Sequence, residues 1–169
     1  MVVELEIVSG GQTGVDRGAL DAALDRGVPC GGWCPQGRLA EDGRIPDRYP
    51  LREIEGGYVE RTRRNVEDSD GTLIIHFGVP TGGTLATLEF CAELGRPFHL
   101  VDGNEVPATA AVSGVRRFVA EHGIRKLNVA GPRASGSRDG NRYAYAVVRR
   151  LLMGAVASSP ANDSRQDGA

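Results

Sequence analysis

The sequence has few cysteines and no long apolar run, and each of these two absences excludes a class of protein. Three cysteines, Cys30, Cys34 and Cys91, are too few and odd in number for a disulfide framework. No apolar stretch approaches the ~20 residues that a membrane-spanning helix needs. We therefore expect neither a disulfide-rich secreted domain nor a protein that spans a membrane.

The sequence also lacks a strong excess of either positive or negative charge. The formal net charge is -2 and the pI is about 5.9, whereas proteins that bind nucleic acid or membrane surfaces by charge carry a strong basic excess. We therefore expect no nucleic acid and no membrane as partner. The first residues lack the basic start of a signal peptide, which favours a cytoplasmic protein.

Metal-ligand patterns are also missing. Cys30 and Cys34 are spaced C-x-x-x-C, which is not the usual spacing of zinc or redox sites, and neither His76 nor His99 forms a local ligand pattern with them. The sequence therefore predicts no structural metal.

Apolar segments with strand character alternate with segments of helical period along nearly the whole chain. Such alternation predicts an α/β fold, a Rossmann-like three-layer arrangement with a mostly parallel central sheet and helices on both faces. We expect one ligand-binding domain over residues 1–157 and a disordered tail over residues 158–169, which are polar. Strands are expected at 5–8, 28–33, 51–54, 72–77, 97–101 and 126–130. Helices are expected from a cap at Thr13 to Gly27, then at 58–69, 84–94, 108–122 and around 143–155. Val59 is expected on the inner side of the second helix, and Leu85 and Ala92 on that of the third.

Three glycine-rich turns are the most informative positive feature. Each follows an expected strand and leads into a helix, and a helix start carries unpaired N–H groups and positive dipole charge that attract anions such as phosphate. Each turn alone is also consistent with a plain strand-to-helix connection. Because the carboxyl ends of parallel strands meet at one edge of the sheet, we expect the turns to form a single binding site there. Their residues are Gly10, Gly11, Gln12, Thr13 and Gly14; then Gly82, Gly83 and Thr84; then Gly131, Pro132, Arg133 and Ser135.

The order and content of these turns resemble the molybdenum cofactor carrier family, over about Leu5 to Met153. That family lies in a Rossmann-like superfamily with the cytokinin-activating phosphoribohydrolases, formerly called lysine decarboxylase-like, and with nucleotide sensor domains. The matching segments are GGQTGVD at 10–16, WCPQGR at 33–38, RT at 61–62, NV at 65–66, DSD at 68–70, GGT at 82–84 and LNVAGPRAS at 127–135.

The resemblance implies a cytoplasmic homo-oligomer that carries molybdenum cofactor (molybdopterin) as cargo without transforming it. A molybdoenzyme or a cofactor-biosynthesis protein is the partner that it implies. The glycine-rich turns would hold the phosphate, and the amide or guanidinium groups of Gln12, Asn128 and Arg133 would contact the pterin or the phosphate. Trp33 is a candidate for stacking on the flat ring and Arg38 for binding phosphate, although a core position and a solvated loop charge are the common alternatives.

An enzyme is the alternative, because the phosphoribohydrolases carry a glycine-rich signature that ends in glutamate. Residues 80–89 read PTGGTLATLE, so Glu89 is kept, but Leu85 and Ala86 break the pattern. On that interpretation Glu89 and an arginine such as Arg64 would be catalytic; otherwise Glu89 is a helix-surface carboxylate. A sensor of a nucleotide signal is a third interpretation, and the sequence does not identify the heterocycle.

Overall fold

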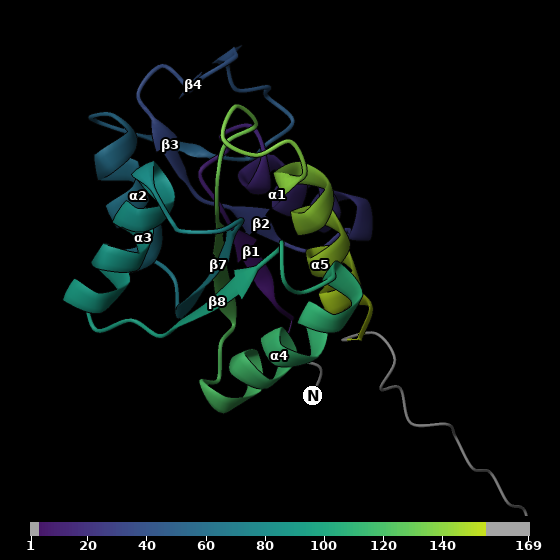
Figure 1. Ribbon diagram of the computed structural model, residues 1–169. Helices are drawn as coiled ribbons and strands as arrows, with labels where there is room; N and C mark the ends of the chain where they lie inside the picture. Colours follow the sequence, from purple (N-terminus) through teal and green to yellow (C-terminus); the bar gives the residue numbers. More distant parts are fainter. Residues whose placement is uncertain (1–3, 155–169) are drawn as a thin grey trace, which may run out of the picture.

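A computed structural model describes residues 4–154 and shows a five-stranded parallel sheet with helices on both faces (Figure 1). The strand order is β2-β1-β9-β7-β8, and every neighbouring pair is parallel. This confirms the predicted Rossmann-like α/β fold. The strands are β1 (Glu6–Val8), β2 (Cys30–Gly31), β7 (Gly71–His76), β8 (Phe98–Asp102) and β9 (Lys126–Ala130).

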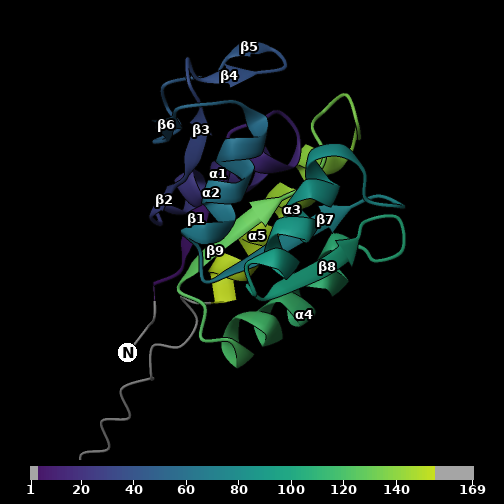
Figure 2. The same ribbon diagram turned by 90° about the vertical axis from the view of Figure 1, so that its left-hand side faces the viewer.

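The helices divide between the two faces of the sheet. On one face α1 packs against α5 and α5 against α4, and on the other face α2 packs against α3 (Figures 1 and 2). The five helices are α1 (Val15–Arg26), α2 (Tyr58–Glu67), α3 (Gly82–Glu93), α4 (Ala108–Glu121) and α5 (Gly140–Gly154).

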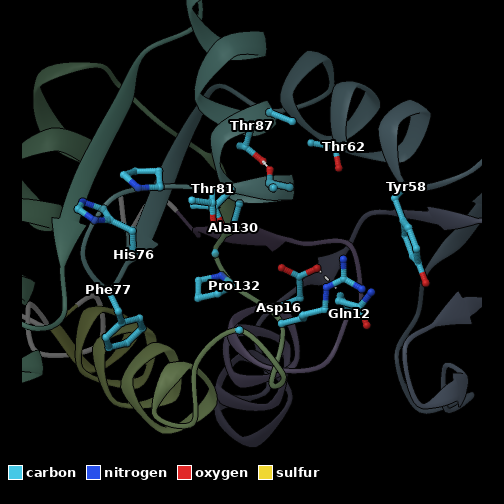
Figure 3. A pocket seen from close by; sticks show the side chains of 18 of the residues that line it. Gln12, Asp16, Tyr58, Thr62, His76, Phe77, Thr81, Thr87, Ala130 and Pro132 are labelled. Carbon is cyan, nitrogen blue, oxygen red and sulfur yellow. Dashed lines mark hydrogen bonds between the residues drawn. The ribbon is translucent and has the colours of Figure 1, made fainter.

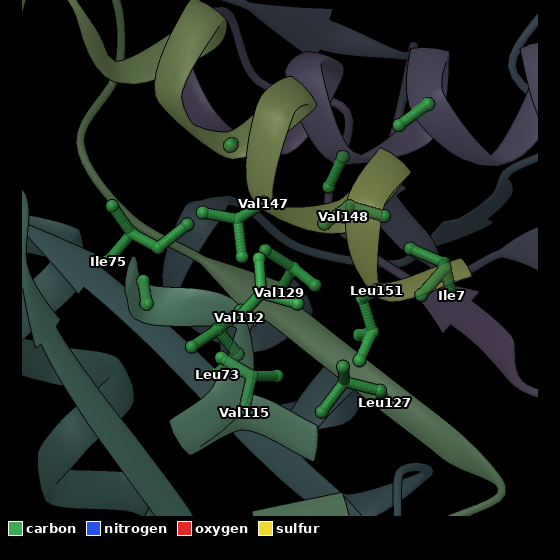
Figure 4. Close-up of a cluster of buried hydrophobic side chains, with 14 of the residues drawn as sticks. Ile7, Leu73, Ile75, Val112, Val115, Leu127, Val129, Val147, Val148 and Leu151 are labelled. Atoms are coloured by element: carbon green, nitrogen blue, oxygen red, sulfur yellow. The ribbon is translucent and has the colours of Figure 1, made fainter. Parts of the chain in front are cut away.

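The main core lies between the sheet and the α1, α4 and α5 layer, where branched aliphatic side chains from both sides interdigitate (Figure 4). Ile7, Leu73 and Leu127 point from the strands into this layer and are fully buried, and Val115 and Val147 meet them from α4 and α5. Burying such side chains is worth roughly 1.5–3 kcal/mol each. This packing fixes the strands whose carboxyl ends carry the glycine-rich turns.

The long segment between β2 and α2 folds into two small ribbons. A parallel pair is formed by β3 (Trp33–Pro35) and β6 (Arg52–Ile54), and an antiparallel hairpin by β4 (Leu39–Ala40) and β5 (Gly43–Arg44). The buried side chains of Ile45 and Tyr49 anchor the segment against α1. Figure 2 shows the β4–β5 hairpin at the same end of the molecule as the carboxyl ends of the central strands.

Most predicted elements are present, with local differences at the helix starts. Thr13 does not cap α1, because Gly14 occupies the N-cap position and no side chain bonds there. Helix α3 begins at Gly82, two residues before the predicted start. Val59 and Leu85, which we expected to be buried, are 61% and 38% exposed, so the apolar period misplaced those faces. The predicted tail, residues 158–169, lies outside the described residues.

No helix within residues 4–154 combines the length and the apolar character that crossing a membrane requires.

Candidate functional site

A cavity of about 450 Å³ opens at the carboxyl edge of the sheet, between the starts of α2 and α3 and the turn after β9 (Figure 3). This size lies within the range of pockets for small organic ligands. The edge is the place where open parallel sheets bind their ligands. The residues that line the cavity are Gln12, Asp16, Tyr58, Val59, Arg61, Thr62, His76, Phe77, Val79, Pro80, Thr81, Gly82, Gly83, Thr84, Ala86, Thr87, Ala130, Gly131, Pro132, Arg133 and Gly136.

The N-terminal turn of α3 borders this cavity with unused hydrogen-bond donors. Among the described residues, no protein group accepts a hydrogen bond from the backbone N–H of Gly82, Gly83 or Thr84. A β-carbon added at Gly82 or Gly83 would meet nothing within 4 Å, and the first turn holds no acidic side chain. Three free N–H groups and the positive helix end therefore face the space that a ligand can enter.

The N-terminal turn of α1 lies on the other side of the cavity, and protein groups bind most of its N–H groups; those of Gly14 and Asp16 have no acceptor among the described residues. The backbone N–H of Gln12 donates to the Asp16 carboxylate at 3.1 Å, and that of Thr13 donates to the Gln12 side-chain oxygen at 3.1 Å. The Val15 N–H donates to the carbonyl of Pro132 at 3.2 Å. A β-carbon on Gly14 would collide with that same carbonyl. The glycine-rich sequence here therefore allows two loops to pack together.

Asp16 is the buried charge of the site. Its Oδ2 accepts from Arg61 Nη1 at 3.1 Å, and the side chains of Asp16 and Arg61 are 6% and 13% exposed. Burial raises the pKa of the Asp16 carboxyl, and the Arg61 guanidinium and the Gln12 N–H oppose that rise. Arg61 Nε is buried and has no partner within the described residues. Arg61 therefore keeps unused donor capacity.

Tyr58 gives the cavity a flat aromatic surface with positive charge on its rim. The guanidinium carbons of Arg61 and Arg133 lie 5.6 and 5.9 Å from the centre of its ring. Arg133 comes from the turn after β9, with its side chain half exposed. An aromatic ring with two guanidinium groups near it suits a flat ligand that carries negative charge.

The structure brings some predicted site residues into the cavity and leaves others outside. Those that line it are Gln12, Gly82, Gly83, Thr84, Gly131, Pro132 and Arg133. Those that do not are Gly10, Gly11, Thr13, Gly14, Trp33, Arg38, Asn128 and Ser135.

Arg38 and Trp33, two predicted site residues that lie outside the cavity, have protein partners. Arg38 is 8% exposed, and its guanidinium donates to the backbone carbonyls of the loop that contains Ile45 and Tyr49. It therefore organises that loop. Trp33 donates its indole N–H to Asp68 and lies beneath the guanidinium of Arg64.

The remaining outside candidates are also held by protein groups. The Asn128 amide lies inside the sheet and donates to the Thr72 hydroxyl at 3.3 Å. Thr13 and Ser135 bind the carboxylate of Glu41, a residue at the tip of the β4–β5 hairpin. Gly10 makes room for the Arg61 guanidinium, which a β-carbon at that position would overlap.

The residues of the enzyme alternative also lie outside the lining. Glu89 is exposed on α3. Arg64 pairs with Asp68 at 3.1 Å on the outer surface of α2. Asp16 is the only carboxylate among the lining residues that the structure describes.

Sequence reasoning did not assign Tyr58, Thr62 or Thr87 to the site, and it preferred Arg64 to Arg61. A usable signal existed, since Tyr58, Arg61 and Thr62 have the three- and four-residue spacing of a single helix face. The sequence did not show that this face borders the sheet edge, because the small β3–β6 ribbon that positions α2 has no strong pattern. Within residues 4–154, no group of three or more His, Cys, Asp or Glu side chains is arranged to hold a metal ion.

Comparisons with known proteins agree with this architecture. The model of the circularly permutated YpsA SLOG family matches residues 7–152. A crystal structure from Syntrophus aciditrophicus SB, described as "Putative molybdenum carrier protein", is 39% identical, with a TM-score of 0.85, and the match covers 89% of this chain and 96% of that one. No curated protein matches the chain. Nearly the whole described domain is covered by both matches, and the chain therefore belongs to the circularly permutated YpsA SLOG family.

Proposed function

We propose that this protein binds molybdenum cofactor, or a related phosphorylated pterin or nucleotide, and holds it without transforming it. The observation that carries the proposal is the open N-terminal turn of α3, where three backbone N–H groups have no acceptor among the described residues. A phosphate placed there gains charge-assisted hydrogen bonds and the favourable helix dipole.

The rest of the cavity supplies what a flat, anionic ligand needs. Tyr58 offers an aromatic ring, and the guanidinium groups of Arg61 and Arg133 add positive charge near it. Gln12 and Asp16 place an amide and a carboxylate at the wall opposite α3 (Figure 3), where they could meet the polar edge of a pterin. The volume of about 450 Å³ accommodates a small heterocycle with one phosphate.

The choice of molybdenum cofactor over other phosphorylated heterocycles is supported by the relative that is named as a molybdenum carrier. Molybdenum would arrive as part of the cargo. Under this proposal the protein works in the cytoplasm as a homo-oligomer, and a molybdoenzyme or a cofactor-biosynthesis protein exchanges the cargo with it.

The direct test is to isolate the protein without oxygen from its native host, denature it and oxidise the released material. Pterin fluorescence and metal analysis by mass spectrometry then identify the cargo. Near-stoichiometric phosphorylated pterin together with molybdenum is the expected result. A nucleotide in place of pterin would redirect the proposal to a sensor or an enzyme, and release of neither pterin nor molybdenum would contradict carriage of this cofactor.

Nucleotide hydrolysis is the second candidate, and the observation in its favour is Asp16. A buried carboxyl with a raised pKa in a ligand cavity is a common feature of catalytic sites. Incubation with nucleoside monophosphates, with ribose 5-phosphate release as the readout, separates the two. Release that is lost in Asp16→Asn would establish an enzyme, whereas a carrier releases none.

A further inference from the structure

The carboxylate of Glu41 occupies a cluster of donors at the rim of the cavity. It accepts hydrogen bonds from the Thr13 hydroxyl, from the Ser135 hydroxyl at 2.6 Å and from the Ser135 backbone N–H at 3.1 Å. Arg133 Nε lies 4.0 Å away. We refer to the donors of Thr13, Arg133 and Ser135 as the rim cradle.

The rim cradle has the composition of an oxyanion site. Two hydroxyls, one backbone N–H and one guanidinium converge on a single carboxylate, and phosphate oxygens use the same donors. These donors lower the pKa of the Glu41 carboxyl, with the hydroxyls of Ser135 and Thr13 as the largest causes. The cradle therefore favours a bound negative charge.

Glu41, whose carboxylate occupies the rim cradle, comes from a separate part of the chain. Glu41 lies at the tip of the β4–β5 hairpin, whereas the cradle belongs to the turns after β1 and β9. Few contacts hold the tip: the Glu41 N–H donates to the Gln12 side-chain oxygen at 2.9 Å, and Asp42 pairs with Arg17 at 2.6 Å. The hairpin strands are two residues each, so withdrawal of the tip breaks little regular structure.

The geometry points to the rim cradle as a second binding site for a tetrahedral oxyanion, with the Glu41 carboxylate as a built-in competitor that the oxyanion displaces. Gln12 and Arg133 line the cavity and also contact Glu41, so the cradle adjoins the space that the ligand enters. A ligand with two anionic groups would bind one at α3 and the other at the rim, and its arrival would release the hairpin. This inference rests on the proposed function only in placing an anionic ligand in the cavity.

The test uses inorganic phosphate as the probe and backbone amide resonances as the readout. In the wild-type protein, Glu41 competes at the effective concentration of a tethered group, which is about millimolar. In Glu41→Gln, we expect the Ser135 amide to shift with phosphate at a Kd about tenfold or more lower than in the wild type. Glu55→Gln removes an equal charge from an exposed residue outside the hairpin and should bind phosphate at Ser135 as the wild type does.

Two outcomes would overturn the inference: no phosphate-dependent shift at Ser135 in Glu41→Gln, or an equal gain in Glu55→Gln. The double variant Glu41→Gln with Ser135→Ala should lose the gain. The Gly83 amide reports the α3 site in the same spectra. A response at Gly83 without one at Ser135 would leave the proposed function intact and reject the rim cradle, and the reverse would reject the α3 phosphate site alone.

A second measurement needs no variant. In the wild-type protein, saturating phosphate should speed hydrogen exchange at the Glu41 amide, because that N–H loses its Gln12 acceptor when the hairpin tip withdraws. Unchanged exchange at Glu41 while phosphate binds at Ser135 would reject displacement. Molybdate can replace phosphate in the same titration. If both anions shift the Ser135 amide and displace the Glu41 carboxylate with similar Kd values, the cradle recognises tetrahedral oxyanions as a class.

Discussion

Two glycine-rich turns with similar sequences are used in opposite ways. At α1, the N–H groups of Gln12, Thr13 and Val15 are bound by Asp16, by the Gln12 side chain and by the Pro132 carbonyl. At α3, the N–H groups of the first turn have no acceptor within the described chain, and its glycines border open space. The first turn serves packing, and the second is available to a ligand.

The difference shows that a glycine-rich helix start is an anion site only where the fold leaves its donors free. The closing groups at α1 come from far along the chain, as when Pro132 binds the N–H of Val15. No local pattern contains that information. The rim cradle lies beside this turn, with Thr13 from the turn itself and Arg133 and Ser135 from the loop after β9.

The largest effect should come from filling the closed turn. Gly14→Ala places a β-carbon against the Pro132 carbonyl in a residue with φ of 82°, and we expect it to lower the free energy of unfolding by about 3 kcal/mol. Gly83→Ala is the matched control, because its β-carbon meets nothing within 4 Å and alanine favours a helix. Chemical denaturation measures both. Equal losses would mean that the two turns do not differ.

Charge at the open turn should separate binding from stability. Gly83→Asp places a carboxylate beside the free N–H groups, and we expect it to weaken binding of a pterin phosphomonoester by about a hundredfold. The same charge at a helix N-terminus should leave the free energy of unfolding unchanged or raise it by about 0.3–1 kcal/mol. Fluorescence titration and denaturation give the two values, with Gly83→Asn as the uncharged control. Wild-type affinity in Gly83→Asp would remove α3 as the phosphate site.

The sequence was sufficient for most of the fold. The strand at 126–130 is observed with the predicted bounds, because an apolar run between polar neighbours has few alternatives. Helix α3 was harder, since Leu85 and Ala92 are exposed although both were expected to be buried. Its apolar residues lie on all sides, so periodicity could not indicate the buried face.

The site was predicted less completely, for a physical reason. The sheet edge and the three turns followed from the order of strands and helices. Whether a polar side chain faces ligand or protein depends on distant partners: Arg38 was considered as a phosphate ligand, yet its donors are taken by carbonyls of its own loop. Trp33 was a candidate for stacking on the heterocycle, whereas Tyr58 and Phe77 are aromatic residues that line the cavity.

Two carboxylates at the closed turn should respond to pH with opposite signs. Burial raises the pKa of Asp16, so the folded protein binds that proton more tightly than the unfolded chain. Its contribution to stability falls as the pH rises from the ordinary carboxyl pKa through the raised one. We therefore expect the stability of Asp16→Asn relative to the wild type to rise as the pH rises from acid to pH 7.

Glu41 should show the reverse. Its pKa is lowered by the Ser135 and Thr13 hydroxyls, so its contribution is present above the ordinary carboxyl pKa and is lost as the pH falls through the lowered one. Glu41→Gln should be less stable than the wild type at pH 7, with the gap closing in acid. Denaturation between pH 3 and 7, a range set by the carboxyl pKa values, measures both variants. A pH dependence of the same sign in both variants would show that burial does not dominate at Asp16.

The smallest expected effect concerns the positive charge of Arg133, in the turn after β9. Arg133 is half exposed, lines the cavity together with Tyr58 and lies near Glu41. Arg133→Gln should weaken binding of a pterin phosphomonoester by about three- to fivefold, with the loss shrinking in high salt, because exposed charges are screened. Arg138→Gln changes the net charge equally from a position that does not line the cavity. If both variants lose the same affinity, Arg133 acts through the general field of the protein, and recognition depends on the open α3 turn.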